Sequence, residues 1–120
     1  MFVLLVFLLI SYAPSAYPEI FEVPGDYSNI TLALEATTTN DTVWVRPGLY
    51  QDRLIFPAHD VVLISDFFML GDSAAIDSTI IDASIFADLD TASVITFVNS
   101  NSRATLVGGF TLTGGHGLAG

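Results

Sequence analysis

The sequence predicts an all-β fold in which short strands stack in parallel, as the coils of a solenoid. After residue 40 the chain divides into short runs rich in Val, Ile, Leu, Phe and Thr, separated by Asp, Gly, Pro and Asn, as expected for strands and turns. No Asn-Gly or Asp-Gly pair, the strongest hairpin signal, joins two runs. The tail "GGFTLTGGHGLAG" is Gly-rich, which suits sharp turns between neighbouring coils. An antiparallel sandwich also has many short strands, but it needs the missing hairpin turns.

The expected strands are residues 19–23, 42–46, 53–56, 61–65, 78–82, 93–98, 104–107 and 110–113. A short helix is expected between the first two, because Ser28 is a good N-cap and Ile30, Ala33 and Leu34 recur at helical spacing. These three side chains form one apolar face. We expect the helix to cover the open end of the strands that follow it.

The first residues predict a secretory signal. "MFVLLVFLLI" is an apolar core that is too short to span a bilayer comfortably, and "SYAPSA" supplies small residues for cleavage. No Lys or Arg precedes this core, so the terminal amine is its only positive charge. We therefore expect a signal peptide over residues 1–16, cut between Ala13 and Tyr17, and a secreted or cell-surface domain over residues 17–120, with no membrane span after signal removal.

Charge and cysteine content exclude several classes of function. Three Arg, no Lys and thirteen acidic residues give a formal net charge of −10. Nucleic acids and anionic membrane surfaces need clustered positive charge, so neither is an expected partner. The chain has no cysteine, which excludes disulfides and thiolate metal sites. An exported domain of this kind must be stabilised by its core alone.

The segment "GLYQD" (residues 48–52) is the first candidate for a site. Asp52 could serve as a catalytic acid. The favoured interpretation is structural: Gly48 turns the chain, Tyr50 covers the corner and Asp52 accepts a hydrogen bond within the turn. The segment "SDFFMLGD" (residues 65–72) is expected to be a loop or strand that packs over the core.

Acidic and histidine side chains provide the other candidates. The dense acidic group consists of Asp72, Asp77, Asp82, Asp88 and Asp90. It lacks a calcium-loop motif, so solvated turn acids are expected, with Asp82 a turn acceptor after "TII"; weak Ca²⁺ binding at the rim is the alternative. His59 and His116 have no second ligand nearby in sequence and are expected at the surface. No catalytic residue, metal site or cofactor is predicted.

The ordered segments "VPGDYSNITLALEA", "VRPGLYQDRLIF", "STIIDAS" and "GFTLTGG" resemble the N-terminal part of proteins of the pectate-lyase-like superfamily. The likeness runs from Ile20 to Gly120 and is nearest to the bacterial surface and secreted type. It implies a right-handed parallel β-helix with a short N-terminal capping helix, truncated at the C-terminus because the chain ends within a coil. It also implies that Gly48, Tyr50, Asp52 and Asp82 mark the fold, although Asp52 stands where pectin methylesterases have Glu.

The resemblance implies two alternative functions. The first is a non-catalytic secreted or cell-surface module that contacts a polysaccharide or cell-surface glycan, or serves as a stalk. The second is the N-terminal fragment of a polysaccharide-active enzyme, such as a lyase, an esterase or a hydrolase, with its catalytic coils beyond residue 120. Neither alternative assigns carbohydrate-binding residues within the chain.

Overall fold

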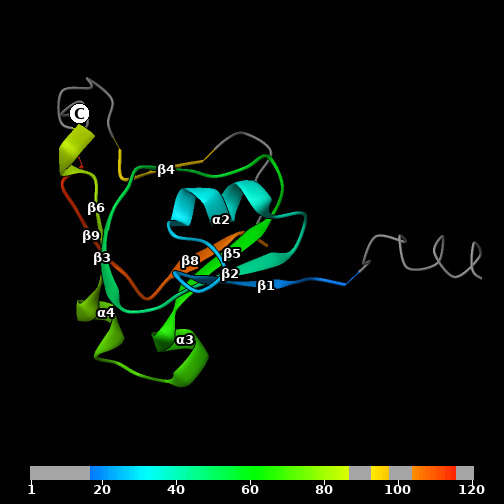
Figure 1. Ribbon diagram of the computed structural model, residues 1–120, viewed down its shortest axis with the longest axis horizontal. Helices are drawn as coiled ribbons and strands as arrows, with labels where there is room; N and C mark the ends of the chain where they lie inside the picture. The colour runs from blue at the N-terminus through cyan, green and yellow to red at the C-terminus, as the bar shows by residue number, and fades with distance from the viewer. Residues whose placement is uncertain (1–16, 87–92, 98–103, 116–120) are drawn as a thin grey trace, which may run out of the picture.

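The computed structural model describes residues 17–86, 93–97 and 104–115 (Figure 1). Its strands form three sheets, and every pairing between the described strands is parallel. The four-stranded sheet consists, in order, of β1 (Ile20–Val23), β2 (Asp41–Val45), β5 (Val61–Ser65) and β8 (Leu106–Gly108). The three-stranded sheet consists of β3 (Gly48–Gln51), β6 (Thr79–Asp82) and β9 (Thr111–Thr113). The last sheet pairs β4 (Leu54–Ile55) with β7 (Ile95–Thr96).

Helices lie between these strands, so the prediction of an all-β solenoid is wrong. The described residues contain α2 (Ile30–Ala36), α3 (Asp66–Leu70), α4 (Ala75–Ser78) and the 3-10 helix η1 (Ser84–Phe86). Helices combined with parallel sheets of two to four strands make an α/β-type arrangement. An antiparallel sandwich is excluded as well, because the pairings are parallel.

The segment "SDFFMLGD" is helical because local caps outweigh its apolar composition. The hydroxyl oxygen of Ser65 accepts a hydrogen bond from the Phe67 N–H at 3.2 Å, which caps the first turn of α3. Gly71 ends the helix in the left-handed conformation (φ 70°), and its N–H donates to the Phe67 carbonyl at 3.1 Å. The expectation of a loop or strand here was wrong.

Strand β3 was also missed, because "GLYQ" was interpreted as a corner. These residues pair in parallel with β6, from Gly48 opposite Thr79 to Gln51 opposite Asp82. The turn lies just before the strand, where the Tyr50 hydroxyl donates to the Arg46 carbonyl at 2.7 Å. Val61–Ser65 has the expected bounds, and the other expected strands differ from the observed ones mainly at their ends.

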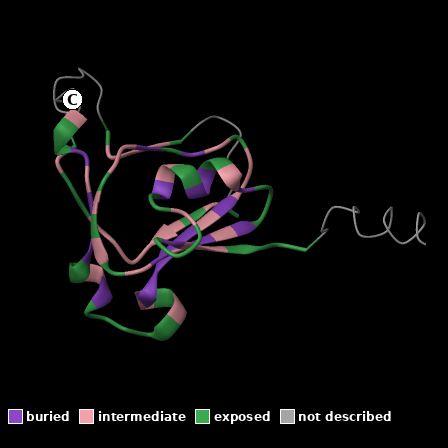
Figure 2. Cartoon of the chain, viewed as in Figure 1, coloured by how far each residue is buried: buried purple, intermediate pink, exposed green. Residues whose placement is uncertain are grey.

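The core forms where α2 covers one end of the four-stranded sheet. Ile30, Ala33 and Leu34 are buried, as the helical spacing predicted. They pack with buried side chains of β1, β2, β4 and β5, the most enclosed of which are Val23, Val43, Val45, Leu54, Val61 and Leu63. Figure 1 shows α2 between β4 and the four-stranded sheet, and Figure 2 shows the buried residues converging there. The N-cap is Asn29 rather than the predicted Ser28, because the Asn29 side chain accepts the Leu32 N–H at 2.8 Å.

The predicted signal peptide (residues 1–16) lies outside the described residues. In the part of the chain that the structure describes, no helix is both long and apolar enough to cross a membrane.

A buried carboxylate joins the first two strands. Asp41 is 3% exposed and accepts hydrogen bonds from the Glu19 N–H (2.8 Å), the Thr38 N–H (2.7 Å) and the Thr38 hydroxyl (3.1 Å). Burial acts to raise the pKa of Asp41, but these hydrogen bonds and nearby His59 outweigh burial and lower the pKa below its ordinary value of 3.8. The ionised form is therefore the one that stabilises the fold.

Replacing Asp41 should cost stability in a pH-dependent way. An Asp41→Asn variant turns an amide NH₂ towards N–H donors, and should lose about 2 kcal/mol of unfolding free energy at pH 7. Because the folded-state pKa is lowered, this contribution is complete above 3.8 and fades as the pH falls through the folded-state pKa. Urea unfolding of both proteins from pH 7 to pH 2 measures the difference. A difference that stays constant over this range would contradict the assignment.

Candidate functional site

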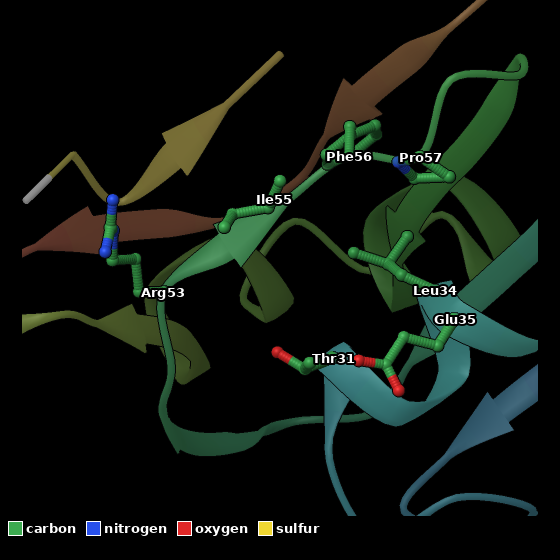
Figure 3. A pocket seen from close by; sticks show the side chains of 7 residues that line it. All are labelled: Thr31, Leu34, Glu35, Arg53, Ile55, Phe56 and Pro57. Atoms are coloured by element: carbon green, nitrogen blue, oxygen red, sulfur yellow. The ribbon is translucent and has the colours of Figure 1, made fainter. Parts of the chain in front are cut away.

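A pocket of about 340 Å³ opens between α2 and the segment that carries β4. We call it the α2–β4 slot. Its lining residues are Thr31, Leu34, Glu35, Arg53, Ile55, Phe56 and Pro57. Figure 3 shows the side chains of α2 on one side and those of residues 53–57 on the other.

Side-chain hydrogen bonds tie the two walls together near the start of α2. Thr31 donates to the carboxylate of Asp52 through its hydroxyl (2.6 Å) and its backbone N–H (3.2 Å). The same carboxylate accepts the Arg53 N–H at 2.9 Å. Asp52 therefore holds the first turn of α2 and fixes the backbone that enters the slot.

A second link joins the walls at the other end of the helix. Thr37, the C-cap of α2, donates its hydroxyl hydrogen to the Leu34 carbonyl at 2.6 Å. The same oxygen lies 2.9 Å from His59 Nε2. Because the hydroxyl hydrogen of Thr37 is already used, His59 Nε2 must be the donor in this contact. His59, expected at the surface without a role, thus anchors the far end of the slot.

The slot follows from a mismatch in length between its two walls. Six residue steps along a helix, from Thr31 to Thr37, cover about 9 Å. Seven extended steps, from Asp52 to His59, reach up to about 23 Å. With both ends linked to α2, the longer segment cannot lie flush along the helix, even after the linking side chains take up part of the difference.

The walls of the slot are largely apolar. Leu34 and Phe56 are buried, whereas the side chain of Ile55 is 57% exposed and Pro57 is partly exposed. Leu54 and Phe56 are buried in the core, and Ile55, between them in sequence, faces outward. The alternation along β4 therefore provides an exposed aliphatic side chain beside a buried one.

Two charged side chains complete the lining. Glu35 is exposed on α2, four residues after Thr31 and hence on the same side of the helix. Arg53 is partly buried, and its Nε is buried without a hydrogen-bond partner in the described part of the chain. No ion pair of Arg53 is found there either. A half-buried cation with no counter-charge among the described residues is unusual in so acidic a protein.

Arg46, unlike Arg53, has carboxylate partners among the described residues. The Arg46 guanidinium pairs with Glu22 (3.1 Å) and with buried Asp66 (3.1 Å), and lies over the Trp44 ring at 5.0 Å. The hydrogen bond to Glu22 and the charge of Asp66 raise the pKa of Arg46. Trp44 Nε1 also donates to Asp66 at 2.8 Å. These contacts join β1, β2 and α3, and the charge of Arg46 is balanced by the carboxylates of Glu22 and Asp66.

The predicted motif residues lie near the slot or at turns. Gly48 begins β3 against the Tyr50 ring, and burial raises the pKa of the Tyr50 hydroxyl above 10.0. Asp52 holds the start of α2, as described above. Asp82 accepts the Ser84 N–H at 2.9 Å, in the turn after β6. Among the hydrogen bonds described here for these four residues, those of Asp52 reach residues that line the slot, Thr31 and Arg53.

The remaining candidates do not assemble into a site. Asp72 accepts the Ala74 N–H at 3.0 Å, and Asp77 is exposed in α4. Asp88, Asp90 and His116 lie outside the described residues. Among the residues that are described, no group of three or more His, Asp or Glu side chains could hold a metal ion.

Sequence reasoning missed the slot itself. Glu35 could have been found, because it lies one helical turn after Thr31 on the polar side of a predicted helix. No sequence pattern around Arg53 or Ile55 singles them out, because they line the slot only through the position of α2 opposite them.

Comparisons of this chain with family models, with curated proteins and with solved structures find no match. The resemblance to the pectate-lyase-like superfamily therefore stays a sequence-based prediction.

The link between Asp52 and Thr31 can be measured directly. In a double-mutant cycle, Asp52→Asn and Thr31→Val should show a coupling energy of about 1.5 kcal/mol, because a charge-assisted hydrogen bond joins the two side chains. Urea unfolding of the four proteins gives this value. In the control cycle, Asp72→Asn replaces Asp52→Asn, and its coupling with Thr31→Val should be below about 0.5 kcal/mol. Equal coupling in the two cycles would refute the link.

Proposed function

We propose that this protein is a non-catalytic recognition module, secreted or displayed at a cell surface, that binds carbohydrate in the α2–β4 slot. One observation carries the proposal: the largely apolar slot is lined by Arg53, whose buried Nε has no hydrogen-bond partner among the described residues, and by the exposed carboxylate of Glu35.

This lining matches the two kinds of surface on a sugar ring. The C–H groups of a pyranose form an apolar face, which can lie against Ile55 and Pro57. The hydroxyl groups along its edge both donate and accept hydrogen bonds. A carboxylate such as Glu35 accepts from adjacent hydroxyls, and a guanidinium such as Arg53 donates to them. Such hydrogen bonds to charged groups are stronger than neutral ones.

The size of the slot also supports a small polar ligand. Ligand pockets usually measure roughly 300–1,000 Å³, and the α2–β4 slot, at about 340 Å³, falls at the lower end. Hydrogen bonds link α2 to the opposite segment near both ends of the helix. A preformed slot reduces the ordering that binding must otherwise impose.

The small number of carboxyl groups in the slot favours binding of a carbohydrate over its hydrolysis. Glycoside hydrolysis usually requires two carboxyl groups on either side of the bond that is cleaved. Among the residues that the structure describes, Glu35 is the one carboxyl group that lines the slot. Nearby Asp52 uses both of its oxygens in hydrogen bonds to Thr31 and to the Arg53 backbone, so it is committed to holding the helix.

Binding can be tested with a matched pair of variants. The exported chain (residues 17–120) should bind a member of a panel of plant and bacterial oligosaccharides without cleaving it. Ile55→Asp should lower the affinity at least tenfold, because it places a desolvated charge against the sugar face. Leu49→Asp is the control: Leu49, on β3, is 60% exposed, against 57% for Ile55, and does not line the slot. Isothermal titration calorimetry measures both affinities.

Three results would contradict the proposal. They are the absence of binding to any member of the panel, an equal loss of affinity in the two variants, and cleavage of the bound oligosaccharide. The last result would favour the alternative, a polysaccharide-active enzyme.

A further inference from the structure

We propose that the protein self-associates as a two-fold dimer through the edge of β9, with this strand in one copy running antiparallel to the same strand of the second copy. The inference is independent of the proposed function, because none of the residues that line the α2–β4 slot belongs to β7, β8 or β9. It is carried by the open end of the core, by the free edge of β9 and by the distribution of acidic residues.

The apolar core is closed by α2 at one end and is open at the other. On the side away from α2, the three sheets end in β7, β8 and β9. The ring of Phe97 lies 4.8 Å from that of buried Phe56, yet Phe97 is 52% exposed. Leu112 pairs with Ile81, which is fully buried, yet Leu112 is 48% exposed. Two rows of core side chains thus end in an apolar side chain that is half exposed.

The backbone of β9, the last strand of its sheet (Figure 1), presents Leu112 to the open side. The Thr113 carbonyl accepts the Ala83 N–H at 3.0 Å, so the backbone groups of Thr113 face β6. Successive residues of a strand direct these groups to opposite sides, so the N–H and C=O of Leu112 face away from β6. No strand in the described part of the chain pairs with β9 on that side. A free edge of this kind is a template for pairing with another chain.

Two hydrogen bonds hold this edge in place. The Ser65 hydroxyl donates to the Gly109 carbonyl at 2.6 Å, just before β9. The Thr111 hydroxyl, on β9 itself, donates to the Ile76 carbonyl of α4 at 2.7 Å. The strand is therefore fixed before it meets a partner, which lowers the ordering cost of association.

The distribution of charge selects this end of the molecule. All thirteen acidic residues lie between Glu19 and Asp90, and the described residues after Asp90 carry no charged side chain. With a net charge of −10, two copies repel each other wherever acidic faces meet. The centre of a protein interface is depleted in charged residues, and edges that stay free commonly carry charges that block pairing. The edge of β9 has no such protection.

A second copy of the same end fits this surface. The triplet Thr111, Leu112, Thr113 reads the same in both directions, so an antiparallel pair centred on Leu112 places the two leucines opposite each other. They then exchange both backbone hydrogen bonds. Their side chains lie on the core side of the sheet, in register with buried Ile81, so the pairing joins two open cores. A head-to-tail arrangement lacks this self-complementary register and builds open-ended filaments.

Analytical ultracentrifugation of residues 17–120 measures the self-association. We expect the weight-average mass to rise from one copy to two between about 1 and about 200 µM, because two backbone hydrogen bonds and a small apolar contact make a weak interface. Raising NaCl from about 20 to about 300 mM should strengthen the dimer at least threefold, since salt screens the repulsion between two acidic copies.

A matched pair of variants locates the interface. Leu112→Asp should weaken the dimer at least tenfold, because it places two like charges directly opposite each other. Leu49→Asp is the control: it adds the same charge to β3, the other edge strand of the same sheet, where Leu49 is 60% exposed. The control should change the association by less than about threefold beyond the effect of the added net charge. Circular dichroism checks that both variants keep the fold.

Single cysteines test the register, because the chain has no cysteine of its own. Opposite residues of a hydrogen-bonded antiparallel pair have Cα atoms about 5.5 Å apart, within the range that a disulfide accepts. Leu112→Cys should therefore cross-link two copies under mild oxidation at least tenfold faster than Leu49→Cys. This measurement decides the matter if Leu112→Asp fails to fold.

Four results would overturn the proposal. They are the mass of a single copy at every concentration, a series of species larger than a dimer, equal weakening by the two aspartate variants, and equal cross-linking of the two cysteine variants. The last two would assign the contact to a surface other than the β9 edge.

Discussion

The position of helix α2 is the constraint on which the rest of the structure depends. Seven residues are too few for a stable helix on its own, so α2 exists because its apolar face is buried and its two ends are linked. Asp52 holds the first turn and His59 holds the C-cap. The same helix covers the end of the four-stranded sheet and forms one wall of the slot. The stability of the fold and the proposed binding surface thus both depend on α2.

The spacing of apolar residues in the sequence predicted the helix and the strands that are determined by residues close to one another in the chain. The spacing of Ile30, Ala33 and Leu34 identified the helix and its buried face, and the β-branched run Val61–Ser65 gave a strand with its observed bounds. The sequence pattern failed where helix-capping residues outweigh the preference of an apolar run for a strand. Ser65 and Gly71 turn an apolar, strand-like run into α3, and this error, with α4, led to the wrong all-β class. A stronger weight on paired capping residues would have identified α3.

The slot could not be predicted, because its features depend on residues far apart in the sequence. The sequence predicted that Asp52 accepts a hydrogen bond within its own turn, but Thr31, which donates to Asp52, lies 21 positions away, in the helix. His59 contacts Thr37 across 22 positions. Arg46 has two carboxylate partners because of the packing of β1, β2 and α3, whereas Arg53 has no ion pair with any residue that the structure describes. The sequence shows three similar Arg residues and no difference between them.

The most direct test of the central claim, that the slot binds the ligand, is to map the ligand on the protein. Residues 17–120 labelled with ¹⁵N would be titrated with the oligosaccharide that binds best, while ¹H–¹⁵N correlation spectra are recorded. The account predicts that the largest shifts fall on the amides of residues 31–35 and 53–56, and on the Arg53 side-chain Nε–H. Shifts that are largest on the α3–α4 segment or on β3, with residues 31–35 unchanged, would contradict it.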